Sequence, residues 1–166
     1  MQASCLLKDN NFHIEKAGVG DARVLAVMVG ELLDEIMSAT GSHAFNFDLD
    51  ETTARLKGFL EQGRYFVLMA RDGVGAASGF VALYESYALY AEGVYGTIPE
   101  LYVRPAHRSM GIGCRLVQGA KAYGAERGWK RIEVTTPPLP QFDRTLAFYE
   151  RQGFAVSGGR KLRVLL

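Results

Sequence analysis

The chain has 166 residues, 48% of them hydrophobic, and its nineteen Lys and Arg residues nearly balance eighteen Asp and Glu residues, giving a formal net charge of +1. This length favours one domain over residues 12–166, preceded by a flexible tail at residues 1–11. The sequence has no basic block and no run of roughly 18 apolar residues, so we expect a soluble cytoplasmic protein without nucleic-acid or membrane partners.

One strand and two helices are predicted in the N-terminal part of the chain. Alternating apolar residues predict a strand over residues 12–17, and Asp21 is a candidate cap for the helix that follows. Apolar residues at spacings of three and four predict this helix over residues 22–38, namely Leu25, Met28, Val29, Leu32 and Ile36. After a polar loop, Asp48 or Asp50 is expected to cap a second helix that ends at Gly63.

The remainder of the chain alternates between predicted strands and helices. Aromatic and β-branched runs predict three hairpin-linked strands at residues 65–70, 78–89 and 94–103. A helix over 111–127, a strand over 131–135 and a short helix from Asp143 to Gly153 follow. Two last strands are expected at 154–156 and 161–165. This order predicts an α+β fold, with helices packed on the faces of a central sheet.

Six residues at the start of the 111–127 helix carry the strongest functional signal. Arg108-Ser109-Met110-Gly111-Ile112-Gly113 follows a short strand and opens the helix. Glycine lets a ligand approach the backbone, and the unpaired N–H groups of a first helical turn attract anions, with Arg108 as an added charged donor. A P-loop would need Lys and then Ser or Thr after Gly113, but Cys114 and Arg115 stand there. A dinucleotide-binding fingerprint would need a small residue at position 116, where this chain has Leu116, so both motifs fit poorly. An ordinary helix start is the alternative to a phosphate site.

Two motifs resemble the GNAT superfamily of N-acetyltransferases. They are LYVRPAHRSMGIGCRLV, which contains the family's Gln/Arg-x-x-Gly-x-Gly/Ala signature, and LAFYERQGF about 40 residues later, and the likeness covers most of residues 12–165. The resemblance implies a mixed, mostly antiparallel sheet that is splayed between its fourth and fifth strands, here residues 94–104 and 131–135. It also implies acetyl-coenzyme A as the cofactor.

The resemblance assigns cofactor contacts to individual positions. The pyrophosphate of coenzyme A would be held by the backbone amides of Arg108, Ser109, Met110, Gly111, Ile112, Gly113 and Cys114. Main-chain groups of Leu101 and Val103 would pair with the pantetheine arm. The chain departs from many relatives at Phe142, where they carry Asn, and in the run of residues 137–140, which contains three prolines. No metal site is expected, and Cys5 and Cys114 are predicted to be free thiols.

Acetyl transfer to an amine needs a base, an oxyanion donor and an acid for the departing thiolate. By the resemblance, Tyr149 is the candidate acid, and its alternative role is that of a core aromatic residue. Glu100 is the candidate base, directly or through a water molecule, and its alternative role is that of a solvated or salt-bridged surface group. The main-chain N–H of Val103 is the expected oxyanion donor.

The acceptor amine is left open by the sequence. The loop between the first two helices is expected to form part of the acceptor wall. The candidate pocket residues are Phe45, Phe47 and Asp48 from this loop and Tyr84, Tyr87, Tyr90 and Tyr95 from the strands. The aromatic residues of the strand pair are equally suited to sheet packing or a dimer surface. His107, in the turn beside Arg108, is expected to be exposed or near the phosphate rather than to act as a base, and His43 lies in the loop between the first two helices. Asp48, Asp50 and Glu51 are compatible with a cationic amine and also with helix capping.

Taken together, these motifs predict an acetyl-coenzyme A-dependent N-acetyltransferase that acts on a primary amine of a small molecule or protein by direct attack on the thioester. The alternative is a non-catalytic acyl-coenzyme A-binding module with the same fold. A homodimer is compatible with either function.

Overall fold

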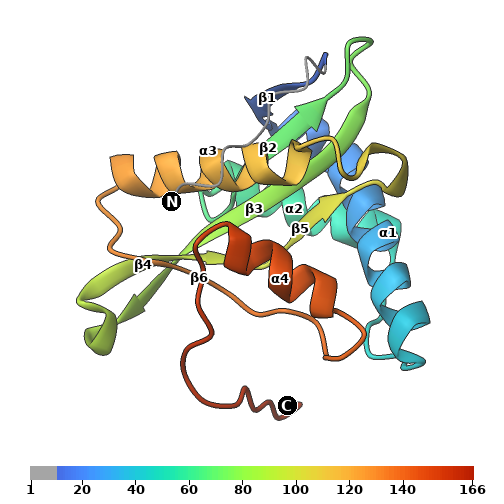
Figure 1. Cartoon of the computed structure of the whole chain (residues 1–166). Coiled ribbons are helices and arrows are strands. Elements are labelled where there is room, and N and C mark those ends of the chain that lie inside the picture. Colours follow the sequence, from blue (N-terminus) through green and yellow to red (C-terminus); the bar gives the residue numbers. More distant parts are fainter. Residues whose placement is uncertain (1–10) are drawn as a thin grey trace.

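The structure is a computed structural model that describes residues 11–166 (Figure 1). Residues 1–10, which include Cys5 and most of the predicted tail, lie outside the described residues. The sheet has six strands: β1 (His13–Lys16), β2 (Phe66–Arg71), β3 (Ala77–Ala88), β4 (Gly93–Ile98), β5 (Leu101–Val103) and β6 (Ile132–Val134). Its order is β1-β2-β3-β4-β6, and β5 pairs with β3. Within the described chain only the β4–β6 ladder is parallel, which confirms the mixed, mostly antiparallel sheet.

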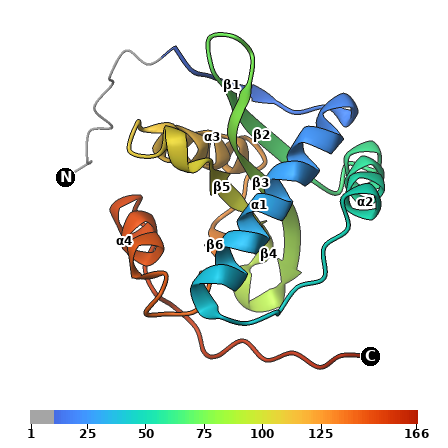
Figure 2. The same cartoon turned by 90° about the vertical axis from the view of Figure 1, so that its right-hand side faces the viewer.

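Helices cover both faces of this sheet (Figures 1 and 2). α1 (Ala22–Thr40) and α2 (Leu49–Glu61) pack on one face, where Leu25 and Met28 of α1 are buried against Phe80 of β3. α3 (Ile112–Glu126) packs on the other face through its predicted apolar stripe, which includes Ile112 and Leu116. α4 (Asp143–Arg151) lies beyond the ends of β5 and β6, on the side away from α2.

The two candidate caps of the N-terminal helices behave differently. Asp48 caps α2, since its carboxylate accepts a hydrogen bond from the Glu51 amide at 2.8 Å. Asp21 occupies the N-cap position of α1, as predicted, but its side chain makes no capping hydrogen bond to that helix. Its carboxylate accepts from the Gly18 amide and from the Arg71 guanidinium instead. Arg71 lies on β2, so a distant ion pair has taken the place of a local cap.

A β-bulge separates β4 from β5. Tyr84 of β3 lies opposite Thr97, whereas Val81 lies opposite Leu101, so the β4–β5 side holds one more residue than β3 over this stretch. The proline at position 99, which has no N–H to donate, lies in the bulge. The extra residue reverses the faces of the strand. Ile98 therefore packs on the α3 side of the sheet, while Tyr102, also even-numbered, packs on the α1 side.

The sheet opens where the bulge occurs. β6 pairs with β4 opposite residues 96–98, and no ladder joins β6 to β5 among the described residues. The splay expected between residues 94–104 and 131–135 is thus present. Residues 96–98 still pair with β6, and the two segments separate after residue 98. One edge of β5 is therefore left without a partner strand.

The two predicted C-terminal strands are absent, which corrects the prediction for 154–156 and 161–165. Phe154 instead closes α4, because its amide donates to the Tyr149 carbonyl at 3.0 Å and its ring packs on the Tyr149 ring. Gly158 follows with a φ of 81°, which interrupts an extended strand. The apolar side chains beyond it, such as Leu162 and Val164, are exposed. In residues 11–166, no helix is both long and apolar enough to cross a bilayer.

Candidate active site

Free main-chain N–H groups gather at the N-terminus of α3. The turn into the helix is made by Ser109 and Gly111, which have φ values of 62° and 83°. The N–H groups of Ser109, Gly111, Ile112 and Gly113 donate no hydrogen bond within the described chain. We call these four N–H groups the amide cradle. Because the positive end of the helix dipole lies at the same place, the amide cradle suits an anion. Met110 and Cys114 lie in the same stretch of chain.

The unpaired edge of β5 leads towards the amide cradle. The Glu100 carbonyl accepts from the Ala82 amide and the Arg104 amide donates to the Ser78 carbonyl, each at 2.9 Å. Successive residues of a strand direct their main-chain groups to opposite edges. The N–H and C=O groups of Leu101 and Val103, the two positions expected to pair with pantetheine, therefore point away from β3 to the open edge.

The Arg108 side chain pairs with α1, whereas its motif predicted that it would lie beside the bound phosphate. Its guanidinium donates to the Glu35 carboxylate of α1 at 3.0 and 2.6 Å, and its Nε donates to the Val103 carbonyl at 2.8 Å. Its amide donates to the Pro105 carbonyl at 3.3 Å. A ligand that pairs with the Val103 carbonyl therefore has to compete with Arg108 for it.

Three elements meet beside the amide cradle. A Cβ built on Gly113 would lie 3.3 Å from the Phe148 ring of α4 and 3.9 Å from the Val103 side chain of β5. A side chain larger than glycine at this position would therefore press on α4. The arrangement brings α4, the open edge and the amide cradle together, as a cofactor stretched along β5 requires.

Tyr149 is buried on α4 between the rings of Phe148 and Phe154, each 5.3 Å away. Its hydroxyl makes no hydrogen bond in the described part of the chain. Every fully buried side-chain oxygen in this part has a hydrogen-bond partner, so the Tyr149 hydroxyl is accessible to solvent. Burial raises the pKa of Tyr149 above its ordinary value. The phenol therefore stays protonated at neutral pH and keeps a proton to donate.

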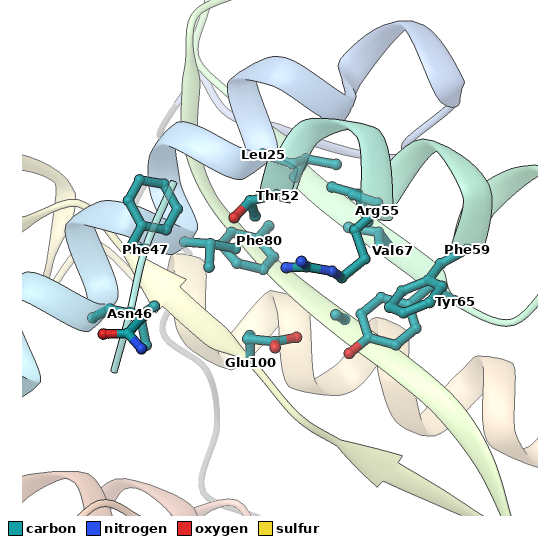
Figure 3. A pocket seen from close by; sticks show the side chains of 14 residues that line it. Leu25, Asn46, Phe47, Thr52, Arg55, Phe59, Tyr65, Val67, Phe80 and Glu100 are labelled. Atoms are coloured by element: carbon teal, nitrogen blue, oxygen red, sulfur yellow. The ribbon is translucent and has the colours of Figure 1, made fainter. Parts of the chain in front are cut away.

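On the opposite face of the strand, Glu100 lines a cavity of about 290 Å³ between the sheet, α1 and α2, which we call the Glu100 cavity (Figure 3). The bulge is responsible for this orientation, since it turns Glu100 and Tyr102 towards α1. Burial raises the pKa of Glu100 to about 7, an effect that the facing Tyr65 hydroxyl only partly opposes. A carboxyl group with a pKa near neutrality is suited to take up and release a proton.

The other walls of the Glu100 cavity come from α1, the α1–α2 loop, α2, β2 and β3. They are formed by Leu25, Val29, Leu33, Asn46, Phe47, Thr52, Arg55, Leu56, Phe59, Tyr65, Val67, Phe80 and Ala82. The Phe47 ring packs on α1 at Gly30. A Cβ added to Gly30 would lie only 2.7 Å from the Phe47 ring. The small residue at position 30 thus makes room for an aromatic wall.

The predicted acceptor residues are only partly brought to this cavity. Among them Phe47 lines it, whereas Tyr84 and Tyr87 line a second cavity that also contains Trp129. Asp48 caps α2, and the aromatic residues Phe45 and Tyr90 are exposed. Neither His43 nor His107 lines the cavity: His43 is exposed, and the ring of the half-buried His107 packs on that of Phe12.

Sequence reasoning missed Tyr65 and Arg55. Tyr65 faces Glu100 and stacks on Tyr84 with ring centroids 6.0 Å apart. In the sequence it reads as the first residue of a strand, and Arg55 reads as one more charge on an amphipathic helix. Arg55 follows Thr52 by three residues, so both lie on one side of α2, and this spacing was the available signal.

The site has the parts needed for a ligand with a pyrophosphate and an extended arm. The amide cradle offers donors to the anion, the open edge of β5 offers main-chain partners to the arm, and Gly113 leaves space between them. Acetyl-coenzyme A, which the motif resemblance implies, has this chemistry. The open edge at Leu101 and Val103 and the Glu100 cavity share one segment of chain at the bulge.

Comparisons with known proteins agree with this geometry. Residues 28–154 match the acetyltransferase (GNAT) family. The chain is 27% identical over 147 residues to YhfO, an uncharacterized N-acetyltransferase of Bacillus subtilis (strain 168), which covers 89% of this chain and 92% of that protein.

Solved structures share the fold at low sequence identity. A GCN5-related N-acetyltransferase from Ralstonia eutropha JMP134 aligns with a TM-score of 0.75 and 20% identity, covering 92% of this chain and 98% of that one. An aminoglycoside acetyltransferase, meta-AAC0020, from an uncultured soil metagenomic sample aligns with a TM-score of 0.74 and 20% identity, covering 95% and 98%. At this identity the alignments establish a common architecture.

Proposed function

Since the chain belongs to the acetyltransferase (GNAT) family of N-acetyltransferases, we propose that it transfers the acetyl group of acetyl-coenzyme A directly to a primary amine of a small molecule or peptide held in the Glu100 cavity. One observation carries this proposal. The bulge at residues 98–100 turns a buried carboxyl group into the cavity, while the next residues of the same strand, Leu101 and Val103, present main-chain groups to the open edge.

The family generally uses acetyl-coenzyme A, and the residues present fit it. The amide cradle would bind the pyrophosphate, and Leu101 and Val103 would pair with the pantetheine arm. When bound, acetyl-coenzyme A supplies an activated acetyl group as a thioester. The N–H of Val103 is directed to the open edge and is the proposed donor to the oxygen that gains negative charge, because a fixed main-chain dipole needs no reorganisation.

Glu100 is the proposed base. A free amine with a pKa of ~10.4 is mostly protonated at neutral pH and must lose a proton to attack a carbonyl carbon. The Glu100 carboxylate, with a pKa of about 7, accepts this proton directly or through a water molecule. The cavity holds the amine against its apolar walls.

Tyr149 is the proposed acid. As the bond between the amine nitrogen and the acetyl carbon forms, the carbon–sulfur bond breaks and its electron pair stays on sulfur. The Tyr149 hydroxyl donates its proton to that sulfur and regains one from solvent after the product leaves. Support comes from its place next to Phe148, whose ring lies 3.3 Å from the position of a Cβ built on Gly113 of the amide cradle.

The proposal is tested by thiol release with a panel of acceptors. Purified protein is mixed with acetyl-coenzyme A and with amino acids, polyamines, aminoglycosides or peptides with free N-termini, and free coenzyme A is measured over time. Calorimetry with acetyl-coenzyme A is run alongside. Amine-dependent release supports the proposal, whereas tight cofactor binding without release from any amine would favour the non-catalytic acyl-coenzyme A-binding module.

The proposal also includes the setting in which this chemistry takes place. Residues 12–166 would act as one acetyltransferase domain in the cytoplasm, where acetyl-coenzyme A is available.

A further inference from the structure

The charges of the Glu100 cavity indicate what kind of amine it accepts. Among the residues that line it, two carry a charge: Glu100 on the sheet and Arg55 on α2. Figure 3 shows the Arg55 guanidinium and the Glu100 carboxyl directed into the same space from opposite walls, with the Tyr65 hydroxyl beside them. The cavity thus presents one site for an amine and one cation.

The Arg55 guanidinium is available to a ligand. Its ion-pair partner among the described residues is Glu51, at 3.6 Å, and the side chains of the two are 61% and 73% exposed. Ion pairs this exposed are weak and exchange readily with solvent or with another anion. No ion pair joins Arg55 to Glu100 among the described residues, so that carboxyl group does not occupy the guanidinium.

The acidic residues near the cavity are used elsewhere. Asp48 caps α2, Asp50 pairs with Arg23 at 2.9 Å, and Glu51 pairs with Arg55. None of the three lines the cavity. An acceptor with several positive charges, such as a polyamine or an aminoglycoside, would find one carboxyl group there and an opposing guanidinium.

The remaining surface of the cavity is mostly apolar and limits the size of the acceptor. Leu25, Val29 and Leu33 of α1 form one side, and the rings of Phe47 and Phe80 form others. A volume of about 290 Å³ suits a small molecule. An apolar body on the acceptor would cover these walls and remove water from around Glu100.

We propose that the acceptor is a small amine that carries a carboxylate a few atoms from its nitrogen and has an apolar body, as in an apolar α-amino acid. Its amine lies at Glu100 and its carboxylate binds the Arg55 guanidinium, which offers paired donors to a carboxylate. This inference rests on the proposed function and names the substrate class for the same site.

The test compares acceptors that differ only in the carboxylate. Thiol release is measured with L-phenylalanine against phenethylamine and with L-leucine against 3-methylbutylamine, and kanamycin and spermidine serve as polycations. The wild-type protein should use each amino acid about 10- to 100-fold more efficiently than its decarboxylated partner, the range expected for one charge-assisted contact. A preference for kanamycin or spermidine over both amino acids would overturn the inference.

Variants at α2 assign the preference to Arg55. Arg55→Gln should lower the ratio of kcat/KM for each amino acid over its decarboxylated partner by about tenfold or more, while Arg55→Lys should retain part of that ratio. Lys57→Gln, on the same helix but outside the cavity, is the matched control and should change neither class. Equal losses for both acceptor classes in Arg55→Gln would contradict a carboxylate contact.

The two proposals fail in distinguishable ways. If the decarboxylated amines are acetylated as well as the amino acids, the proposed function holds and the carboxylate inference is wrong. If none of these amines releases thiol from acetyl-coenzyme A, the proposed function and the inference are both wrong. Binding of L-phenylalanine to the coenzyme A-loaded protein, followed by calorimetry, should weaken in Arg55→Gln independently of turnover.

Discussion

Glu100 and the amide cradle lie near the two ends of one short stretch of chain, residues 98–114. The amide cradle and the Glu100 cavity are nevertheless built from different atoms. The amide cradle consists of main-chain N–H groups next to glycines, within a few residues of one another. The Glu100 cavity consists of side chains from helices, strands and a loop. The difference predicts that backbone geometry controls cofactor affinity, whereas side-chain chemistry controls turnover and acceptor choice.

Glu100→Gln should give the largest effect. The amide cannot accept the amine proton, so kcat/KM for the amine should fall about 10²- to 10⁴-fold, while the affinity for acetyl-coenzyme A stays within about twofold. Thiol-release kinetics and calorimetry measure the two quantities on the same sample. Glu61→Gln, at the exposed end of α2, is the control and should be close to wild type. A loss below tenfold would mean that another group takes the proton.

Tyr149→Phe should lower kcat about 10- to 100-fold, because the departing thiolate loses its proton donor. The ring and its packing on Phe148 and Phe154 are kept, so cofactor affinity and the urea midpoint of unfolding should not change. Tyr123→Phe removes a phenol from the far part of α3 and serves as the control. Unchanged kcat in Tyr149→Phe would leave Tyr149 as a core residue.

Gly111→Asp should break the amide cradle without reaching the cavity. The residue has a φ of 83°, and a carboxylate at the positive end of the α3 dipole would repel a pyrophosphate, so acetyl-coenzyme A affinity should fall at least about tenfold. Gly128→Asp, at the other end of α3 with a φ of 73° and open space around it, imposes a similar backbone strain and is the matched control. Calorimetry on both variants separates strain from lost binding, and equal affinities would refute the cradle.

The pH dependence of the rate should report Glu100. Its carboxylate is the active form, so kcat/KM should rise with pH, by about tenfold per unit below pH 7, and level off above the pKa of about 7. The groups that face it are the Tyr65 hydroxyl, with Tyr84 stacked behind, and the Arg55 guanidinium across the cavity. The limb near pH 7 should disappear in Glu100→Gln, and its persistence in that variant would assign it to a group other than Glu100.

Asp48→Ala should give the smallest effect and distinguish the two regions by stability. Loss of the α2 cap should lower the free energy of unfolding by about 1 kcal/mol in urea titrations. Because α2 carries Thr52 and Arg55, KM for the amine should rise while acetyl-coenzyme A affinity is retained. Asp50→Ala removes only an exposed ion pair with Arg23 and should change stability by less than about 0.5 kcal/mol.

Local patterns in the sequence were enough for the amide cradle and for most elements. Gly111 and Gly113 lie within one turn, and the direction of a main-chain N–H depends on the dihedral angles of its immediate neighbours. The apolar stripes of α1 and α3 likewise follow from spacings within each helix. The motifs around them carried the resemblance to the acetyltransferase (GNAT) family.

Tertiary structure decided the rest, because the relevant contacts join residues far apart in the chain. Arg108 pairs with Glu35, 73 positions away, so its motif could not reveal where its guanidinium would lie. The C-terminal segment shows the reverse case, since its alternating pattern is suited to a strand but has no partner strand in the described structure.

The sequence by itself therefore determined the family, the order of most elements and the main-chain turn that carries the N–H groups of the amide cradle, which depend on short-range spacing. Only the three-dimensional arrangement decided that Glu100 would face a cavity, opposite Tyr65 and Arg55. The reason is that one extra residue in the β4–β5 bulge reverses the faces of a strand, and the effect of that reversal depends on which helices cover each face.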